Sequence, residues 1–297
     1  MQATRALLSP GRWHWQHGPI DIVAQADGDA DAVAAAHEAA WQRFQTVLAE
    51  LVAELPRLRQ PVTDAPCMLQ GPIARRMHAA CAPFWPVFLT PMAAVAGSVA
   101  EELVAFYQRP GIARAWLNNG GDIALHLAPG QSVRVGLLAD LAKLKFDGAR
   151  PNQLDGRFTI AHAMPARGVA TSGWRGRSLS LGIADSVTVL AAGAAQADAA
   201  ATMIANAVNT EHPSIERRPA SQCRDDSDLG ERLVTVDVPP LPAGEIARAL
   251  DAGAGRARAL RARGLIGAAV LVCQEQWRHV EPVSSLSGAR VAPALAA

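Results

Sequence analysis

The segment from Ala113 to Asp140 constrains the fold most, because it consists of short apolar runs joined by turn residues. Its first two runs, ARAWL and DIALHL, are separated by Asn118-Asn119-Gly120-Gly121. Asn and Gly both tolerate positive φ, so these four residues are typical of a tight turn between two strands. Other strand-like runs cover about residues 20–24, 158–162, 168–171, 178–183, 186–190, 233–238 and 265–273. Together they predict a largely antiparallel sheet.

Between these strands, apolar residues recur at the spacing of amphipathic helices. A long helix follows the Asp-rich stretch Asp27–Asp31 and is expected to end at Pro56. Further helices are expected at about residues 73–80, 92–107, 197–208 and 243–263, and a polar surface loop at residues 216–231. Long helices interleaved with short strands predict an α+β fold with helices layered on the sheet. We expect one domain over residues 1–282 and a disordered tail over residues 283–297.

The charge of the chain is balanced. Its 297 residues include 28 basic and 27 acidic side chains, for a formal net charge of +1. This balance argues against a broad surface for nucleic acid or anionic membranes. No apolar stretch reaches the ~20 uninterrupted residues that span a bilayer. The four cysteines form no CxxC pair, so neither a zinc site nor a disulfide framework is expected. We therefore expect a soluble, cytoplasmic protein without nucleic-acid or membrane partners.

Asp198 and Thr202 form the first candidate site. They stand four residues apart near the start of an alanine-rich helix, so the carboxylate and the hydroxyl share one helix face. Such oxygen ligands suit a hard cation like Mg²⁺, which takes few protein groups besides phosphate oxygens. In the structural alternative, Asp198 caps the helix and Thr202 bonds the carbonyl four residues back. Spacing alone favours this alternative.

Two glycine-containing turns are further candidates. Gly120-Gly121-Asp122 can expose backbone N–H groups to a phosphate, although a hairpin turn with a solvated Asp122 fits this segment better. Thr171-Ser172-Gly173 offers two hydroxyls that can hold a phosphate or a ring edge, or it is a plain strand connection. Arg175 and Arg177 follow this second turn, and arginine binds phosphate through its planar fork. A solvated turn fits these residues equally well.

Four short motifs occur in one order: NGGDI at residues 119–123, ATSG at 170–173, SVTV at 186–189 and ADAAAT at 197–202. Together they resemble the FAD:protein FMN transferase superfamily, also called the ApbE superfamily. The resemblance is closest to an uncharacterised ApbE-like branch that shares the sequence TSGWRGRS…SLGIADSVTV and the helix MAAVAGSVAEE. It covers roughly residues 20–209 and implies an ApbE-like, T-fold-like arrangement of the α+β layers.

The resemblance implies a Mg²⁺-dependent site that binds FAD and transfers its FMN half to a threonine of an acceptor protein. Asp198 and Thr202 match the family's metal ligands, and Ala94 matches the residue that lends a backbone carbonyl to the metal. The positions that resemblance assigns to the cofactor are Ala96, Gly97, Gly120, Gly121, Asp122, Thr171, Ser172 and Gly173. Asp122 and Asp185 are the candidates for orienting a nucleophile, and no residue stands out as a general base.

Two departures from the family's pattern bear on the reaction. The transferases read A-x-A-K-G where this chain has Ala94-Val95-Ala96-Gly97-Ser98, so glycine replaces a lysine near the metal and the pyrophosphate. Loss of a positioned cation at a transferring phosphoryl group removes several kcal/mol of transition-state stabilisation. The family's His-x-x-Asp-Pro stretch is also missing before Ser186. The fold inference survives these losses better than the reaction does.

Three functions therefore compete. The preferred one is a diverged enzyme that binds FAD or a related nucleotide-like ligand with Mg²⁺ and cleaves or transfers it at phosphate. The second is authentic FAD:protein FMN transfer to an acceptor protein. The third is a non-catalytic protein that binds a small molecule. Retention of Asp198 and Thr202 favours the first function, and the missing lysine counts against the second.

Overall fold

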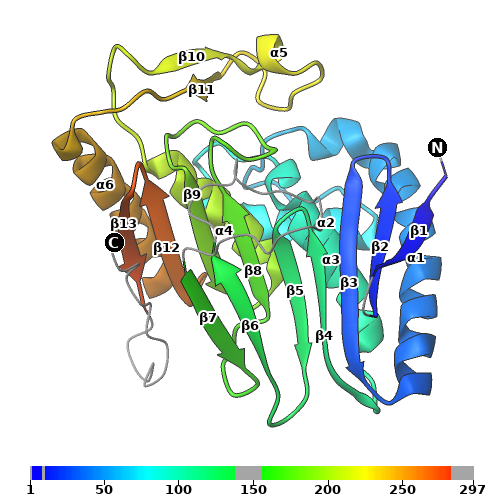
Figure 1. Ribbon diagram of the computed structural model, residues 1–297. Helices are drawn as coiled ribbons and strands as arrows, with labels where there is room; N and C mark the ends of the chain where they lie inside the picture. The colour runs from blue at the N-terminus through cyan, green and yellow to red at the C-terminus, as the bar shows by residue number, and fades with distance from the viewer. Residues whose placement is uncertain (1, 9–10, 138–155, 282–297) are drawn as a thin grey trace. The chain divides into compact units, whose positions relative to one another are not determined.

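The computed structural model describes residues 2–8, 11–137 and 156–281 (Figure 1). The chain groups into two compact units. Unit 1 holds residues 1–133, 161–170 and 191–199, and unit 2 holds residues 134–160, 171–190 and 200–297. The expected tail at residues 283–297 and the end of the strand segment near Asp140 lie outside the described residues. The single domain expected over residues 1–282 stays a prediction.

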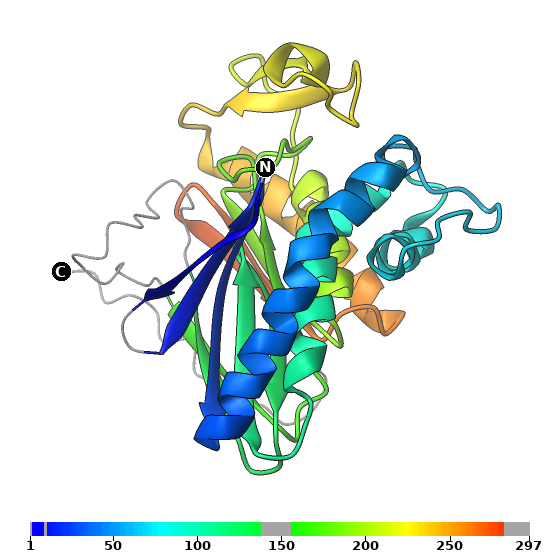
Figure 2. The ribbon, with the colours of Figure 1, turned by 90° about the vertical axis from the view of Figure 1, so that its right-hand side faces the viewer.

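Unit 1 is built on an antiparallel sheet. Its strands lie in the order β1 (Thr4–Leu8), β2 (Arg12–His17), β3 (Ile20–Gly28), β4 (Ile112–Asn119), β5 (Asp122–Leu127) and the first residues of β8 (Gly168–Ser172). Its helices are α1 (Ala30–Leu58), α2 (Pro72–Cys81), α3 (Val95–Val104) and the short 3₁₀ helices η1 (Ala82–Phe84), η2 (Pro91–Ala94) and η3 (Ala105–Tyr107). Figure 2 shows α1 running along β2 and β3, which it contacts. Among the described residues, this antiparallel pairing confirms the sheet type predicted from the turn signals.

Helix α1 begins as its sequence dictates. Asp29 is its N-cap, and the Asp29 carboxylate accepts hydrogen bonds from the N–H groups of Asp31 at 3.1 Å and Ala32 at 3.0 Å. The helix does not end at Pro56, as expected from the sequence, but runs on to Leu58. A proline inside a helix removes one N–H donor, and here the helix stops within two residues of it.

An aromatic cluster packs α1 onto the sheet of unit 1. Trp15 of β2 lies with its ring centre 6.0 Å from that of Trp41 and 5.7 Å from that of Phe44. The side chain of His37, also on α1, is buried beside Tyr107, with 2.7 Å between its Nδ1 and the tyrosine hydroxyl. These large buried rings supply much of the apolar area that stabilises this part of the core.

Unit 2 contains the end of β8, then β9 (Ser186–Ala191), β12 (Ala268–Cys273) and β13 (Gln276–Val280), with β12 antiparallel to both β9 and β13. Helix α6 (Ala243–Ala262) packs on β12 and β13. Helix α4 (Ala194–Ala207) begins in unit 1 and ends in unit 2. The smaller elements are the pair β6 (Ser132–Leu137) and β7 (Gly156–Ala161), the pair β10 (Glu216–Pro219) and β11 (Leu233–Asp237), and α5 (Ala220–Cys223).

Two local predictions are wrong. The strand expected at residues 178–183 is absent from the structure of that segment. Its backbone bonds to α4 and its C-terminal end instead, because Leu181 N–H donates to the Asn206 side chain at 3.0 Å and Ile183 N–H donates to the Val208 carbonyl at 2.8 Å. The polar segment expected as a loop at residues 216–231 contains β10 and α5. The α+β class with a largely antiparallel sheet is confirmed.

Candidate functional site

Asp198 lies in unit 1, where its carboxylate faces the first turn of α3. The Gly97 N–H donates to Asp198 Oδ2 at 2.9 Å, and the backbone of Ala96 also hydrogen-bonds this carboxylate. The N-cap residue of α3 is Ala94, whose side chain makes no cap hydrogen bond. Asp198 therefore supplies to α3 the acceptor that an N-cap side chain ordinarily supplies. The alternative to metal binding, in which Asp198 caps its own helix, named the wrong helix.

A second carboxylate acts on Asp198. Asp198 keeps partial exposure, whereas Asp122, at the start of β5, is only 8% exposed. Burial raises the pKa of Asp198 well above its usual value, and the negative charge of Asp122 raises it further. The backbone bonds from Gly97 and Ala96 act in the opposite direction but do not cancel these effects. Two carboxylates in this arrangement favour binding of a proton or a cation.

Gly97 has no room for a side chain. A Cβ atom at this position would lie 2.3 Å from the Ala194 carbonyl oxygen, so the backbones of α3 and α4 touch here. This contact gives a physical reason for the departure from the A-x-A-K-G pattern. A lysine in place of Gly97 fits only if the two helices separate.

The Gly120-Gly121 pair forms the hairpin turn that the sequence predicts. Asn119 and Asp122 are paired at its end, and both glycines have positive φ, +66° and +117°. The N–H of Gly121 donates to the Asn118 side chain at 2.8 Å, so the turn itself uses this donor. Asp122 is buried rather than solvated. A Cβ at Gly121 would meet no atom within 4 Å, so the turn has an open side.

Asn119 ties this hairpin to α3. Its Nδ2 donates to the Ala96 carbonyl at 3.1 Å, and its Oδ1 accepts from the Asp21 N–H at 3.4 Å. In the sequence, Asn119 has the pattern of a turn residue and opens the NGGDI motif. Its position directly before the glycine pair gave no sign of a buried side chain that bridges to α3. Asn119, Ala96, Gly97, Asp122 and Asp198 thus meet in one region of unit 1.

The remaining candidates lie in unit 2. Thr202 follows Asp198 by one turn on α4 and is partly exposed. In the Thr171-Ser172-Gly173 turn, Thr171 Oγ1 lies 3.0 Å from Thr188 Oγ1. A Cβ at Gly173 would lie 2.4 Å from the Asp185 carbonyl oxygen, so the chain requires glycine there.

Asp185 is a buried structural carboxylate. Its Oδ2 accepts from the Gln274 N–H at 2.5 Å, and its Oδ1 accepts from Trp174 Nε1 at 3.3 Å and lies 3.2 Å from Arg175 Nε. These contacts fix the residues after Gly173 and the turn between β12 and β13. With both oxygens engaged, Asp185 is a poorer candidate than Asp122 for orienting a nucleophile.

The donor set in unit 1 fits Mg²⁺ but not a cage of many protein ligands. Over the described residues, no group of three or more His, Cys, Asp or Glu side chains is placed to hold a metal ion. Mg²⁺ commonly takes one or two carboxylates and completes its octahedron with water and phosphate oxygens. Asp198, with the negative charge of Asp122 nearby, is compatible with this smaller requirement. Ala94 is buried at the same end of α3, where a backbone carbonyl could serve as a further ligand.

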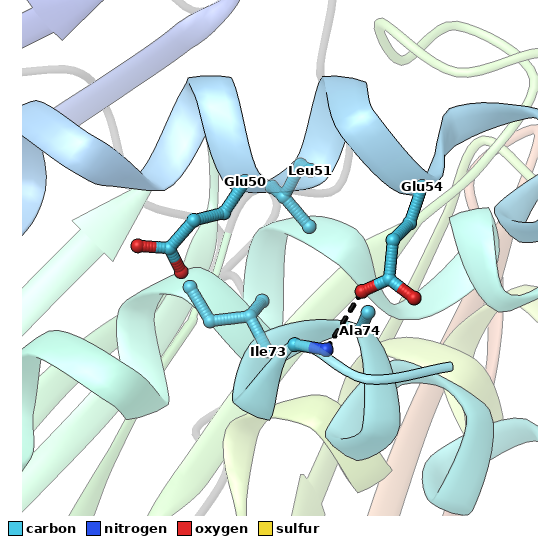
Figure 3. A pocket seen from close by; sticks show the side chains of 6 residues that line it. Glu50, Leu51, Glu54, Ile73 and Ala74 are labelled. Atoms are coloured by element: carbon cyan, nitrogen blue, oxygen red, sulfur yellow. Dashed lines mark hydrogen bonds between the residues drawn. The ribbon is translucent and has the colours of Figure 1, made fainter. Parts of the chain in front are cut away.

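A small hollow between α1 and α2 is not a ligand site (Figure 3). Its lining residues are Glu50, Leu51, Glu54, Gly71, Ile73 and Ala74, and they leave no space for a water molecule. Glu54 accepts from the N–H groups of Gln70 and Gly71, each at 2.7 Å. It thereby fixes the two residues that lead into α2, whose N-cap residue Gly71 has no side chain.

The fold and the region around Asp198 together define an α+β protein in which two carboxylates, those of Asp198 and Asp122, lie near the start of α3. The chain belongs to the family described as AbpE bacteria, whose model matches residues 5–279. This membership confirms the family resemblance of the four motifs. In the described part of the chain, no helix has the length and apolarity needed to cross a membrane.

Curated relatives of this chain are UPF0280 proteins of archaea. The UPF0280 protein MK0206 of Methanopyrus kandleri is 33% identical over 222 residues, which cover 73% of this chain and 83% of the relative. The UPF0280 protein of Methanospirillum hungatei is 39% identical over 139 residues, 46% of this chain and 52% of the relative. That of Methanothermobacter thermautotrophicus is 40% identical over 120 residues, 40% of this chain and 43% of the relative. The chain thus spans about half the length of the last two relatives.

Two solved structures are also similar. A flavin transferase ApbE from Vibrio cholerae has 13% identity and a TM-score of 0.44, with 95% of this chain and 98% of that chain covered. The apo form of the Pseudomonas stutzeri flavinyl transferase ApbE has 12% identity and a TM-score of 0.43, with 95% and 96% covered.

Proposed function

We propose that this protein binds FAD or a related nucleotide-like ligand together with Mg²⁺ and acts on the ligand at phosphate. The Asp198–Asp122 pair is the observation that carries the proposal. Each carboxylate makes the charged form of the other less favourable, and a divalent cation relieves this repulsion. Membership in the AbpE bacteria family supports the ligand class.

In this proposal, the residues of unit 1 have separate tasks. Asp198 binds the ion, with the Ala94 carbonyl at the same helix end. The backbone of Ala96 and Gly97 and the open side of the Gly120-Gly121 turn line the ligand. Bound there, Mg²⁺ would supply positive charge that offsets the negative charge of the ligand's phosphates. Asp122 orients the attacking group.

Three assignments rest on the family resemblance alone. Thr202 remains the proposed second side-chain ligand of the ion, and the Thr171-Ser172-Gly173 turn remains a proposed ligand contact. An acceptor protein remains the proposed partner if the reaction is a transfer. Asp185 drops behind Asp122 as a catalytic candidate because its two oxygens are engaged.

The contact between Gly97 and Ala194 supports a second candidate function. Without a lysine beside the phosphates, the site lacks the cation that phosphoryl transfer ordinarily uses. A protein that binds the nucleotide-like ligand without turning it over is consistent with this loss. Authentic FMN transfer is the least favoured of the three functions for the same reason.

The test is the Asp198→Asn variant. Asparagine keeps an oxygen to accept from the Gly97 N–H, so α3 keeps its cap while the site loses one negative charge. We expect FAD with Mg²⁺ to stabilise the wild type by about 2.7 kcal/mol at a concentration near 100 Kd. The variant should lose most of this stabilisation, and a chelator should remove it from the wild type. Thermal unfolding with FAD, FMN and ADP, each with and without Mg²⁺, provides the measurement.

A matched variant controls for the loss of a carboxylate. Asp27 pairs with Arg114 at the surface of the same unit, so Asp27→Asn should respond to FAD and Mg²⁺ like the wild type. Release of AMP or FMN during incubation separates the enzyme from the binding protein. An Asp198→Asn protein that retains the full metal-dependent stabilisation would show that the ion binds elsewhere.

A further inference from the structure

Helices α3 and α4 cap each other. Glu101 of α3 accepts from the Ala195 N–H in the first turn of α4, at 3.1 Å. Asp198 of α4 accepts from the Gly97 N–H in the first turn of α3, at 2.9 Å. Each helix start thus receives its acceptor from a carboxylate farther along the other helix. Both hydrogen bonds lie within unit 1.

Two glycines allow this double contact. A Cβ at Gly193 would lie 2.6 Å from Glu101 Oε2, so the Glu101 carboxylate lies directly on the backbone that leads into α4. A Cβ at Gly97 would lie 2.3 Å from the Ala194 carbonyl oxygen. Because both contacts are this close, a shift of the first turn of α4 moves Asp198 relative to α3.

One arginine side chain, that of Arg76, pairs with the Glu101 carboxylate. Arg76 of α2 lies with its Nε 3.4 Å from Glu101 Oε1, and its guanidinium also donates to Glu102 at 2.9 Å. Arg43 of α1 pairs with Glu102, also at 2.9 Å. The two neighbouring glutamates therefore differ in their partners. The contacts of Glu102 run to α1 and α2, whereas Glu101 joins α2 to the start of α4.

We infer that Glu101 is a positioning residue for Asp198. By fixing the first turn of α4 against α3, it sets the direction in which the Asp198 carboxylate presents its oxygens. Mg²⁺ requires near-ideal octahedral geometry with short bonds, so a small displacement of one ligand weakens binding strongly. This inference rests on the proposed function, because it assigns to Glu101 an effect on the ion site proposed there.

The experiment compares Glu101→Ala with Glu102→Ala and measures Mn²⁺ affinity by electron paramagnetic resonance, with Mn²⁺ as the probe for Mg²⁺. We expect Glu101→Ala to weaken Mn²⁺ binding roughly 10-fold, the lower end of the effect of losing a direct outer partner of a metal ligand, because Glu101 acts on Asp198 through the first turn of α4. Glu102→Ala should leave Mn²⁺ affinity unchanged. It should also cost more stability in urea, because Glu102 is less exposed, 15% against 33% for Glu101, and pairs with two arginines. If Glu101 had only a structural role, the variant that loses more stability, Glu102→Ala, would also lose more Mn²⁺ affinity.

Rescue provides a second check. Glu101→Gln keeps an oxygen that can accept from the Ala195 N–H, so it should recover most of the Mn²⁺ affinity that Glu101→Ala loses. If Glu101→Ala binds Mn²⁺ as tightly as the wild type, or if both alanine variants weaken binding equally, the inference is overturned.

Amide exchange separates this inference from the proposed function. The Gly97 N–H donates a hydrogen bond to the Asp198 carboxylate. In the absence of any metal, this N–H should exchange with solvent faster in Glu101→Ala than in Glu102→Ala. If the wild type binds no Mn²⁺, the proposed function fails, and the exchange rate of Gly97 alone decides the positioning role. An unchanged Gly97 rate in Glu101→Ala overturns that role whether or not the ion binds.

Discussion

Replacement of Gly97 by lysine is expected to destabilise the protein without raising any flavin-transfer activity. The substitution supplies the lysine of the transferases' A-x-A-K-G pattern, although Ser98 still stands where that pattern has glycine. The Cβ of this lysine would lie 2.3 Å from the Ala194 carbonyl oxygen. Backbone on both sides of the contact cannot rotate away as a flexible side chain can. Overpacking of this kind costs about 1–3 kcal/mol and occasionally more. Urea unfolding of Gly97→Lys and Gly97→Ala measures this cost, and an assay of flavin transfer compares the activity of Gly97→Lys with that of the wild type.

Gly255 of α6 provides the matched control, because a Cβ there would meet no atom within 4 Å. Gly255→Ala should stabilise the protein by up to ~1 kcal/mol, since alanine favours the helix more than glycine does. The same change at Gly97 should have the opposite sign. Equal stabilisation by both alanine variants would contradict the close contact between α3 and α4.

Acidification from pH 6.5 to pH 4 is expected to remove about 3 kcal/mol of stability through His37 alone. Burial lowers the pKa of His37 from 6.5 to about 4, and its side chain is only 7% exposed. In this window the unfolded chain binds the proton and the folded protein does not, so the free energy of unfolding decreases as the pH is lowered. The shift of about 2.5 units at 1.36 kcal/mol each gives the stated magnitude. The contribution is fully present above pH 6.5.

His37→Gln removes this titration and keeps a side chain that can hydrogen-bond the Tyr107 hydroxyl. Urea midpoints of both proteins at pH 7.5 and pH 4 give the comparison. The wild type should lose about 3 kcal/mol more than His37→Gln over this interval. Burial also lowers the pKa of His78 and His126, but these groups titrate in both proteins and cancel. An identical loss in both proteins would place His37 outside the acid response.

Local signals in the sequence predicted the elements that local chemistry determines. The Asn-Asn-Gly-Gly turn requires positive φ at its glycines, and the hairpin forms there. The prediction of a strand at residues 178–183 was wrong because this segment bonds to α4 and to the residue that follows α4 instead of pairing as a strand of the sheet. Strand β1 gave no alternation to detect, since all five of its residues are exposed.

For the candidate site, too, the sequence predicted the local arrangement but not the contacts between distant residues. Helical spacing correctly placed Asp198 and Thr202 one turn apart on α4. It could not show that Asp198 would cap α3, because the Gly97 donor stands 101 residues earlier in the chain. The contact of Glu101 depends on a similarly distant partner, Ala195, 94 residues later. Asn119 bonds to Ala96, 23 residues earlier, and to Asp21, 98 residues earlier. Such contacts become visible only when the fold brings the segments together.

The mutual caps of α3 and α4 also order events during synthesis. Glu101 and Gly97 leave the ribosome long before Ala195 and Asp198, their partners 94 and 101 residues later. A nascent chain that ends before Asp198 can build the strands β1 to β5 and the helix α3, but the first turn of α3 then lacks its acceptor. Closing contacts over such separations is slow. Truncated or stalled chains are therefore expected to lack the proposed ion site even when their sheet has formed.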